Sequence, residues 1–130
     1  MIEFYKDRQK KTLDPLLFSS VAEDWASKVY KSGERERDKN KRSQLRKFYD
    51  EVLRLNALAK MSPGDWDDIH PYVNMLIAKV VYARGRNKVT REFEDMLKSC
   101  ISHVQEDKDL DVFANFFEAF MGFYRQYGEN

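Results

Sequence analysis

The sequence predicts an all-α protein, a single-domain bundle of about five helices spanning residues 1–130. Apolar residues recur at spacings of three and four, and strict alternation is nowhere sustained, which is the pattern of amphipathic helices. The chain is 42% apolar and 14% aromatic, enough to build one sizeable core at this length. Its 35% of charged residues favours a helix-rich surface exposed to water.

The first predicted helix begins after Asp14, a typical N-cap, with Pro15 at the first helical position. It ends near Gly33, and its apolar stripe consists of Phe18, Val21, Ala22, Trp25 and Val29. Residues 31–42 (KSGERERDKNKR) include no apolar side chain, so we expect a charged, flexible, exposed loop there. Residues 1–12 form an N-terminal segment to which the sequence assigns no role.

The second predicted helix has Ser43 as its candidate N-cap. Its inward positions are Leu45, Phe48, Tyr49, Val52, Leu55 and Ala59. Residues 62–64 break this helix, and the acidic DWDD of residues 65–68 reads as a turn or short helical connector with Trp66 packed on the core. From Pro71 the sequence is apolar on most sides, which predicts the central helix of the bundle.

Two further helices complete the prediction. Thr90 is the candidate cap of the fourth, whose stripe is Phe93, Met96, Leu97, Cys100, Ile101 and Val104. Asp109 is the candidate cap of the fifth, which ends near Gly128 and has the stripe Leu110, Phe113, Phe116, Phe117, Phe120, Met121 and Tyr124. Core packing explains most of this wide stripe, and any ring left exposed would form a surface for another copy or a partner subunit.

Enzyme signatures are missing from the chain. It contains no GxxxxGK[ST], GxGxxG, HExxH, CxxC or GxSxG motif. His70 and His103 are 33 residues apart without nearby metal-ligand spacing, and Cys100 lies on an apolar stripe. We therefore predict no catalytic residue, no metal and no cofactor. A weaker interpretation is a hydrolase that binds a divalent metal through the carboxylates of residues 65–68.

The chain also lacks membrane and export signals. Its longest apolar stretches fall well short of the roughly 20 residues that a membrane-spanning helix needs. The N-terminus has no apolar signal core, and the single cysteine fits a reducing compartment. We therefore expect a cytoplasmic protein.

Two basic clusters stand out in a chain whose net charge is only +1. They supply nine candidate nucleic-acid contacts: Lys39, Lys41, Arg42, Arg46, Lys47, Lys79, Arg84, Arg86 and Lys88. Arg46 and Lys47 lie at a predicted helix start, where the helix dipole disfavours cations unless an anion binds there. A solvated face with incidental charges is the alternative interpretation of this first cluster.

The second cluster runs from Lys79 to Arg91 and holds five cations and no acid. On a helix Lys79, Tyr82 and Arg86 share a face, which places two cations around an aromatic ring and suits a phosphate backbone. Gly85 as a C-terminal cap would explain the nearby arginines through the helix dipole. That account leaves Lys79 unexplained, because it sits in the middle of the helix among apolar residues.

Three blocks of the sequence resemble a known family. SQLRKFYDEVLRL from Ser43, AKVVYARGR from Ala78 and FFEAFMGFYRQYG from Phe116 resemble, in order and spacing, the small subunit of type III-A CRISPR effector complexes. The resemblance implies an RNA-binding, non-catalytic helical subunit, present in several copies, that lines the target RNA paired with the guide RNA. It implies the backbone and large subunits of the complex as partners. The alternative from another class is a helical protein-interaction adaptor or homodimer that does not bind nucleic acid.

Overall fold

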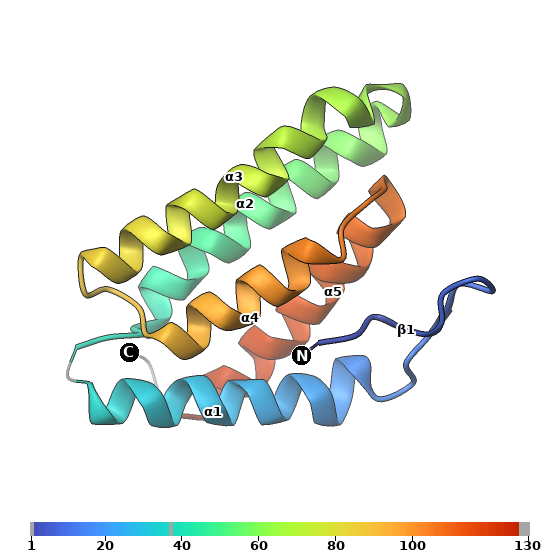
Figure 1. The fold of residues 1–130 in the computed structure, drawn as a ribbon. Helices are drawn as coiled ribbons and strands as arrows, with labels where there is room; N and C mark the ends of the chain where they lie inside the picture. Colours follow the sequence, from blue (N-terminus) through green and yellow to red (C-terminus); the bar gives the residue numbers. More distant parts are fainter. Residues whose placement is uncertain (1, 37, 128–130) are drawn as a thin grey trace.

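The structure, a computed structural model, describes residues 2–36 and 38–127, and within these ranges it forms five α-helices and one short hairpin (Figure 1). The hairpin strands are β1 (Tyr5–Asp7) and β2 (Thr12–Leu13), and the helices are α1 (Ala22–Arg35), α2 (Arg42–Met61), α3 (Trp66–Gly85), α4 (Arg91–Ser102) and α5 (Asp107–Tyr124). Single turns η1 (Leu17–Val21), η2 (Pro63–Asp65) and η3 (Arg125–Tyr127) flank them. The prediction of an all-α bundle of five helices is confirmed.

Helix α5 is the centre of the bundle. It packs on α1 on one side and on α2 on the other, while α4 bridges α1 and α3 (Figure 1). The rings of Phe113, Phe116, Phe117 and Phe120 are fully buried, and Tyr124 is 4% exposed. The stripes predicted for the fourth and fifth helices are therefore both confirmed as core, and the aromatic rings of α5 leave little surface for a partner.

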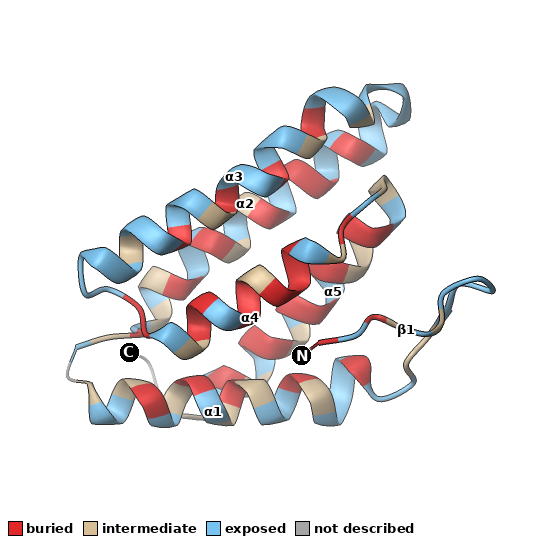
Figure 2. Cartoon of the chain, viewed as in Figure 1, coloured by how far each residue is buried: buried red, intermediate tan, exposed pale blue. Residues whose placement is uncertain are grey.

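Helix α3 lies at the edge of the bundle, so its predicted central position is wrong. It buries only Ile69, Val73, Leu76 and Val80. Its other large apolar side chains, Tyr72, Met75, Val81 and Tyr82, are between 46% and 67% exposed, and Figure 2 shows the helix largely in the colour of exposed residues. A helix that is apolar on several sides is either buried or exposes a surface that can contact a partner. Composition alone does not distinguish the two.

Helix α1 begins about two turns later than the predicted helix, which started at Pro15. The Asp14 carboxylate accepts the Leu16 N–H at 2.9 Å, as expected of a cap, but the next turn is the π-helical η1. This turn changes the register, so Leu17 is buried in place of the predicted Phe18, which is 37% exposed. Ala22 and Val29 lie in the core as predicted.

The loop predicted over residues 31–42 is shorter than expected. Helix α1 continues to Arg35 and α2 begins at Arg42, so only residues 36–41 connect them. The expectation of full exposure is also wrong, because Ser32 is fully buried and Asn40 is 2% exposed. A run without apolar residues can still be buried where its polar groups find partners, which the sequence pattern does not reveal.

Several predicted helix starts move by a few residues. Lys41, not Ser43, is the N-cap of α2, and α3 begins at Trp66 instead of Pro71. Glu106 is the N-cap of α5, and Asp109 is its partner in a capping box. Thr90 does precede α4 as predicted, although its hydroxyl makes no cap hydrogen bond.

Trp66 packs on the core, as predicted, and donates its Nε1–H to the Gln105 carbonyl at 3.2 Å. The end predicted for the last helix, near Gly128, lies outside the described residues.

The N-terminal hairpin closes one end of the core. Ile2 and Phe4 are 1% exposed, and the Ile2 N–H donates to Ser99 Oγ at 2.9 Å. The Tyr5 hydroxyl donates to Asp109 Oδ1 at 2.7 Å, and burial together with this bond raises the pKa of Tyr5 to about 12. The segment to which the sequence assigned no role thus anchors the start of α5 to α4.

Candidate nucleic-acid interface

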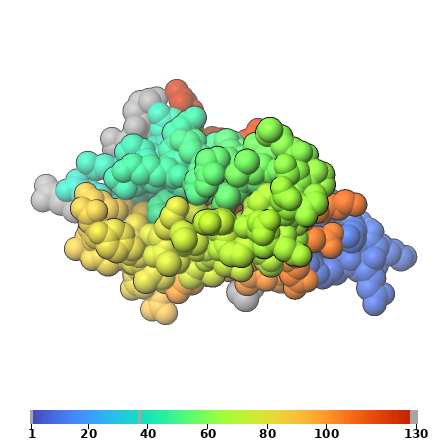
Figure 3. Space-filling model, turned by 90° about the horizontal axis from the view of Figure 1, so that it is seen from above, coloured from blue at the N-terminus to red at the C-terminus, as the bar shows by residue number. Residues whose placement is uncertain are grey.

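A groove between α2 and α3 brings together the two basic clusters. Figure 3 shows these helices side by side along one face of the molecule. The groove has a volume of about 580 Å³ and is lined by Gln44, Lys47, Phe48, Glu51, Leu76, Lys79, Tyr82, Ala83, Arg86 and Lys88. Four of the nine predicted contacts therefore share one open groove, although they come from segments about 40 residues apart in the chain.

Three of the groove cations face water without a carboxylate partner in the described part of the chain. Lys47 reaches the groove from the first two turns of α2, Arg86 from the end of α3 and Lys88 from the turn that follows. The Arg86 guanidinium lies 5.7 Å from the centre of the Tyr82 ring. This cation–π contact leaves the N–H donors of Arg86 available to an anion.

Lys79 differs from these three because it has an intramolecular partner. Its Nζ lies 3.5 Å from Glu51 Oε2, and its side chain is 49% exposed. Arg54 donates two hydrogen bonds to the same carboxylate at 2.9 and 2.8 Å, and these bonds, with the nearby lysine, lower the pKa of Glu51. The ion pair with Glu51 explains how Lys79 is accommodated in the middle of the helix, which the capping interpretation left unexplained.

The turn after α3 sets the position of Lys88. Asn87 takes a left-handed backbone with φ of 61°. Its N–H bonds to the Arg84 carbonyl at 2.9 Å, and the Lys88 N–H bonds to the Ala83 carbonyl at 3.0 Å. This is the Schellman pattern with asparagine at the left-handed position. The alternative interpretation with Gly85 as the cap therefore does not hold, because Gly85 still belongs to the last helical turn.

The other five predicted contacts lie outside the groove: Lys39, Lys41, Arg42, Arg46 and Arg84. Arg46 sits on the side of α2 away from α3, 3.9 Å from Asp50. Arg84 points toward α4, where its guanidinium is 3.2 Å from the nearly buried carboxylate of Glu94. Lys39 pairs with Glu36 at 2.7 Å. Neighbouring residues on a helix point about 100° apart, so Lys47 reaches the groove and Arg46 does not.

The groups weighed for catalysis are engaged in the fold. Cys100 is fully buried, and burial raises the pKa of its thiol well above the usual range. His70 Nε2 lies 2.9 Å from the Val104 carbonyl oxygen. Among residues 2–36 and 38–127, no three His, Cys, Asp or Glu side chains are grouped so that they could hold a metal ion. No helix in those ranges is long and apolar enough to cross a membrane.

These features define a class: a small all-helical protein with an open cationic groove between two antiparallel helices. Residues 16–130 match the family model described as Csm2 type III-A, and the chain belongs to this family. It is thus a small subunit of type III-A CRISPR complexes, from a structural family that is generally non-catalytic. Searches of curated proteins and of solved structures gave no match. The hairpin of residues 5–13 precedes the matched region.

Proposed function

We propose that this chain is a non-catalytic, RNA-binding small subunit that lines and stabilises the target RNA along the guide RNA. The observation that supports the proposal is the convergence of Lys47, Arg86 and Lys88, without carboxylate partners in the described chain, on one groove. Lys79 is a fourth contact once its ion pair with Glu51 opens. Its partners are the RNA duplex, further copies of the chain, and the backbone and large subunits, in the cytoplasm.

Phosphate contacts suit this role because they position a strand without reading its sequence. In a guided complex, base pairing supplies the sequence specificity, so a lining subunit has no need of base contacts. Lysine and arginine side chains that face an open groove match the charge of a phosphate backbone. The proposal therefore requires binding that is insensitive to sequence and sensitive to salt.

The number of available cations sets the expected salt dependence. Each phosphate neutralised on a single strand contributes a slope of about −0.7 in a plot of log affinity against log salt. Three available cations thus give a slope of about −2.1, and affinity falls about twentyfold between 50 and 200 mM salt. One copy binds weakly, and several copies along one RNA add avidity.

Fluorescence polarisation with a labelled single-stranded RNA at these two salt concentrations tests the proposal. We expect Lys47→Glu combined with Arg86→Glu to abolish salt-dependent binding. Arg46→Glu combined with Arg91→Glu is the matched control, because it makes the same charge change at two residues outside the groove. Wild-type binding by the folded groove variant, or equal losses in the groove variant and the control, would contradict the proposal.

A protein contact without RNA is the second candidate function, and the exposed apolar side chains of α3 favour it. Tyr72 and Met75 lie about one turn apart on one face, and Val81 is exposed on another side of the helix, nearer its end. The exposed apolar surface for a partner therefore lies on α3, whereas the sequence led us to expect it on α5. A stable homodimer whose formation is indifferent to RNA and to salt would favour this function over the first, and sedimentation at two salt concentrations measures it.

A further inference from the structure

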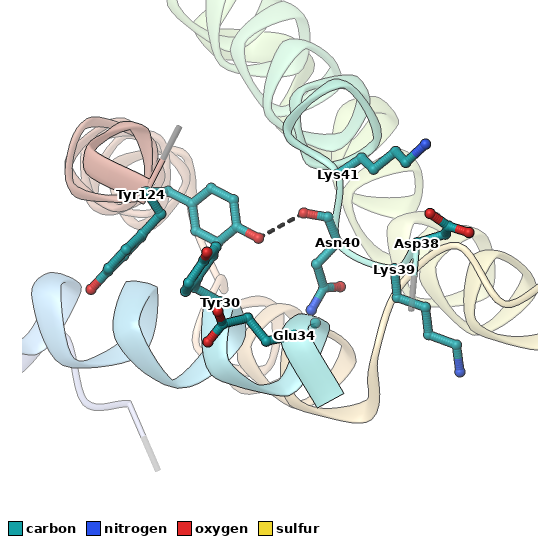
Figure 4. Close-up of a pocket in the computed structure, with 9 residues that line it drawn as sticks. Tyr30, Glu34, Asp38, Lys39, Asn40, Lys41 and Tyr124 are labelled. Carbon is teal, nitrogen blue, oxygen red and sulfur yellow. Dashed lines mark hydrogen bonds between the residues drawn. The ribbon is translucent and has the colours of Figure 1, made fainter. Parts of the chain in front are cut away.

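Asn40, in the connection between α1 and α2, is held by an unusual number of hydrogen bonds. It is 2% exposed and has a left-handed backbone with φ of 60°. Figure 4 shows its carbonyl oxygen receiving the Tyr124 hydroxyl, at 2.6 Å, while Lys39 and Lys41 point away from that tyrosine. The Asn40 amide Nδ2 lies at hydrogen-bond distance from three further acceptors: Val29 O at 3.0 Å, Ser32 Oγ at 3.2 Å and Thr90 Oγ1 at 2.8 Å.

The remaining bonds of Asn40 fasten the segment that carries Lys88. The Asn40 N–H donates to the Lys88 carbonyl at 3.0 Å, and Asn40 Oδ1 accepts the Thr90 N–H at 2.9 Å. Val89 lies between these two bonds and is fully buried. The chain is therefore fixed on both sides of Val89, directly after the turn in which Asn87 ends α3.

The site has strict requirements for the residue at this position. Asparagine tolerates a left-handed backbone better than most residues, and its amide supplies a donor and an acceptor at once. The surroundings are tight, because a Cβ added at Gly33 would lie 3.0 Å from the Lys39 carbonyl oxygen and 3.2 Å from the Asn40 Cβ. Loss of the Asn40 side chain would break its bonds to Val29, Ser32 and Thr90 together and leave its backbone bond to Lys88 as its remaining hydrogen bond to the turn.

We propose that Asn40 is a positioning residue for the groove between α2 and α3, and that it acts through Lys88. This inference rests on the proposed function. The hydrogen bonds of Asn40 join the first basic cluster to the turn after α3 and hold the backbone of Lys88 at the groove. A lysine on a fixed backbone loses less conformational entropy on binding a phosphate than one on a mobile turn, so loosening the turn costs Lys88 its phosphate contact.

The test compares the RNA affinity of Asn40→Gly with that of the wild-type chain. Glycine keeps the left-handed backbone and the backbone N–H that bonds to Lys88, and it removes the side-chain amide that bonds to Thr90. We expect the salt slope to fall from about −2.1 to about −1.4, and the affinity at 0.1 M salt to fall about fivefold, the effect of one lost phosphate contact. Tyr124→Phe is the control: it removes a bond to the Asn40 carbonyl and leaves the bonds of Asn40 to Lys88 and Thr90 in place, so it lowers the melting temperature and leaves the slope unchanged.

A double-mutant cycle with Lys88→Ala shows whether Asn40 acts through this lysine. If it does, Asn40→Gly has no further effect on the slope when Lys88 is already alanine, whereas additive losses would overturn the inference. If the wild-type chain shows no salt-dependent binding, the proposed function itself fails, and this inference with it. If wild type binds and folded Asn40→Gly keeps the full slope, only this inference fails.

A milder variant covers the case in which Asn40→Gly does not fold. Gly33→Ala places a methyl group against the Lys39 carbonyl and the Asn40 side chain, so the connection must shift by a few tenths of an ångström. We expect a smaller loss of slope in the same direction. A folded Gly33→Ala protein with the wild-type slope would then overturn the inference.

Discussion

Removal of one acidic side chain from the groove should strengthen RNA binding. Glu51 is the carboxylate that lines the groove, and it holds Lys79 at 3.5 Å. In Glu51→Gln the amide carries no charge, so Lys79 becomes available to a phosphate and the repulsion between the carboxylate and the RNA disappears. A charge-neutralising change that improves affinity is an unusual result, and it follows directly from this ion pair.

The size of the effect can be worked out from the number of contacts. A fourth available cation changes the salt slope from about −2.1 to about −2.8 and raises the affinity about fivefold at 0.1 M salt. The Glu51 side chain is 22% exposed and its partner Arg54 is 56% exposed, so the lost ion pairs are near the surface. Such pairs contribute about 0 to 1 kcal/mol, and the melting temperature should change little.

Polarisation titrations from 50 to 200 mM salt measure this slope, and thermal unfolding followed by circular dichroism checks the fold. Asp50→Asn is the matched control, since it releases Arg46 on the other side of α2, outside the groove. We expect it to leave the slope unchanged. If folded Glu51→Gln binds RNA no better than wild type, or if both variants gain equally, the assignment of the groove is refuted.

Two predictions concern the fold. Tyr5 has a pKa of about 12 because it is partly buried and bonded to Asp109, against 10.0 in the unfolded chain, so its contribution to stability is complete below pH 10 and is lost as the pH rises to about 12. Urea unfolding between these pH values should therefore show a shallower decline for Tyr5→Phe than for wild type, and parallel curves would contradict this. Cys100 is buried with a raised thiol pKa, so its reaction with a disulfide reagent such as DTNB should be as slow as unfolding itself, and rapid labelling of the native protein would disprove the burial.

The sequence predicted the core helices better than the edge of the bundle. The apolar residues of α4 and α5 recur at spacings of three and four, and all their predicted core residues are buried. Helix α3 has apolar residues around most of its circumference, so periodicity could not show that Tyr72 and Met75 face outward. The partners of an apolar face are a tertiary property, which a single sequence does not contain.

The candidate site was predicted only in part, again because tertiary packing decides which side chains meet. Both basic clusters were identified, but only the packing of α2 against α3 decides that Lys47 enters the groove and Arg46 does not. Two asparagines were missed, Asn40 and Asn87, both of which have positive φ. The only signal in the sequence was the tolerance of asparagine for this conformation, which is too weak to distinguish these two from the other asparagines.

The position of α3 at the edge of the bundle links its docking to ligand binding. α3 packs mainly on α2 and α4; it carries Lys79, and Arg86 follows its last residue. A helix with few buried side chains is the element expected to detach first in local opening, with a free energy below that of global unfolding. A ligand that binds across α2 and α3 must be released before this opening, so each tenfold excess of RNA over its dissociation constant adds about 1.4 kcal/mol to the cost of detaching α3. Amide hydrogen exchange along α3 would thus report on RNA binding at the groove, and a bound strand would in turn hold α3 in place.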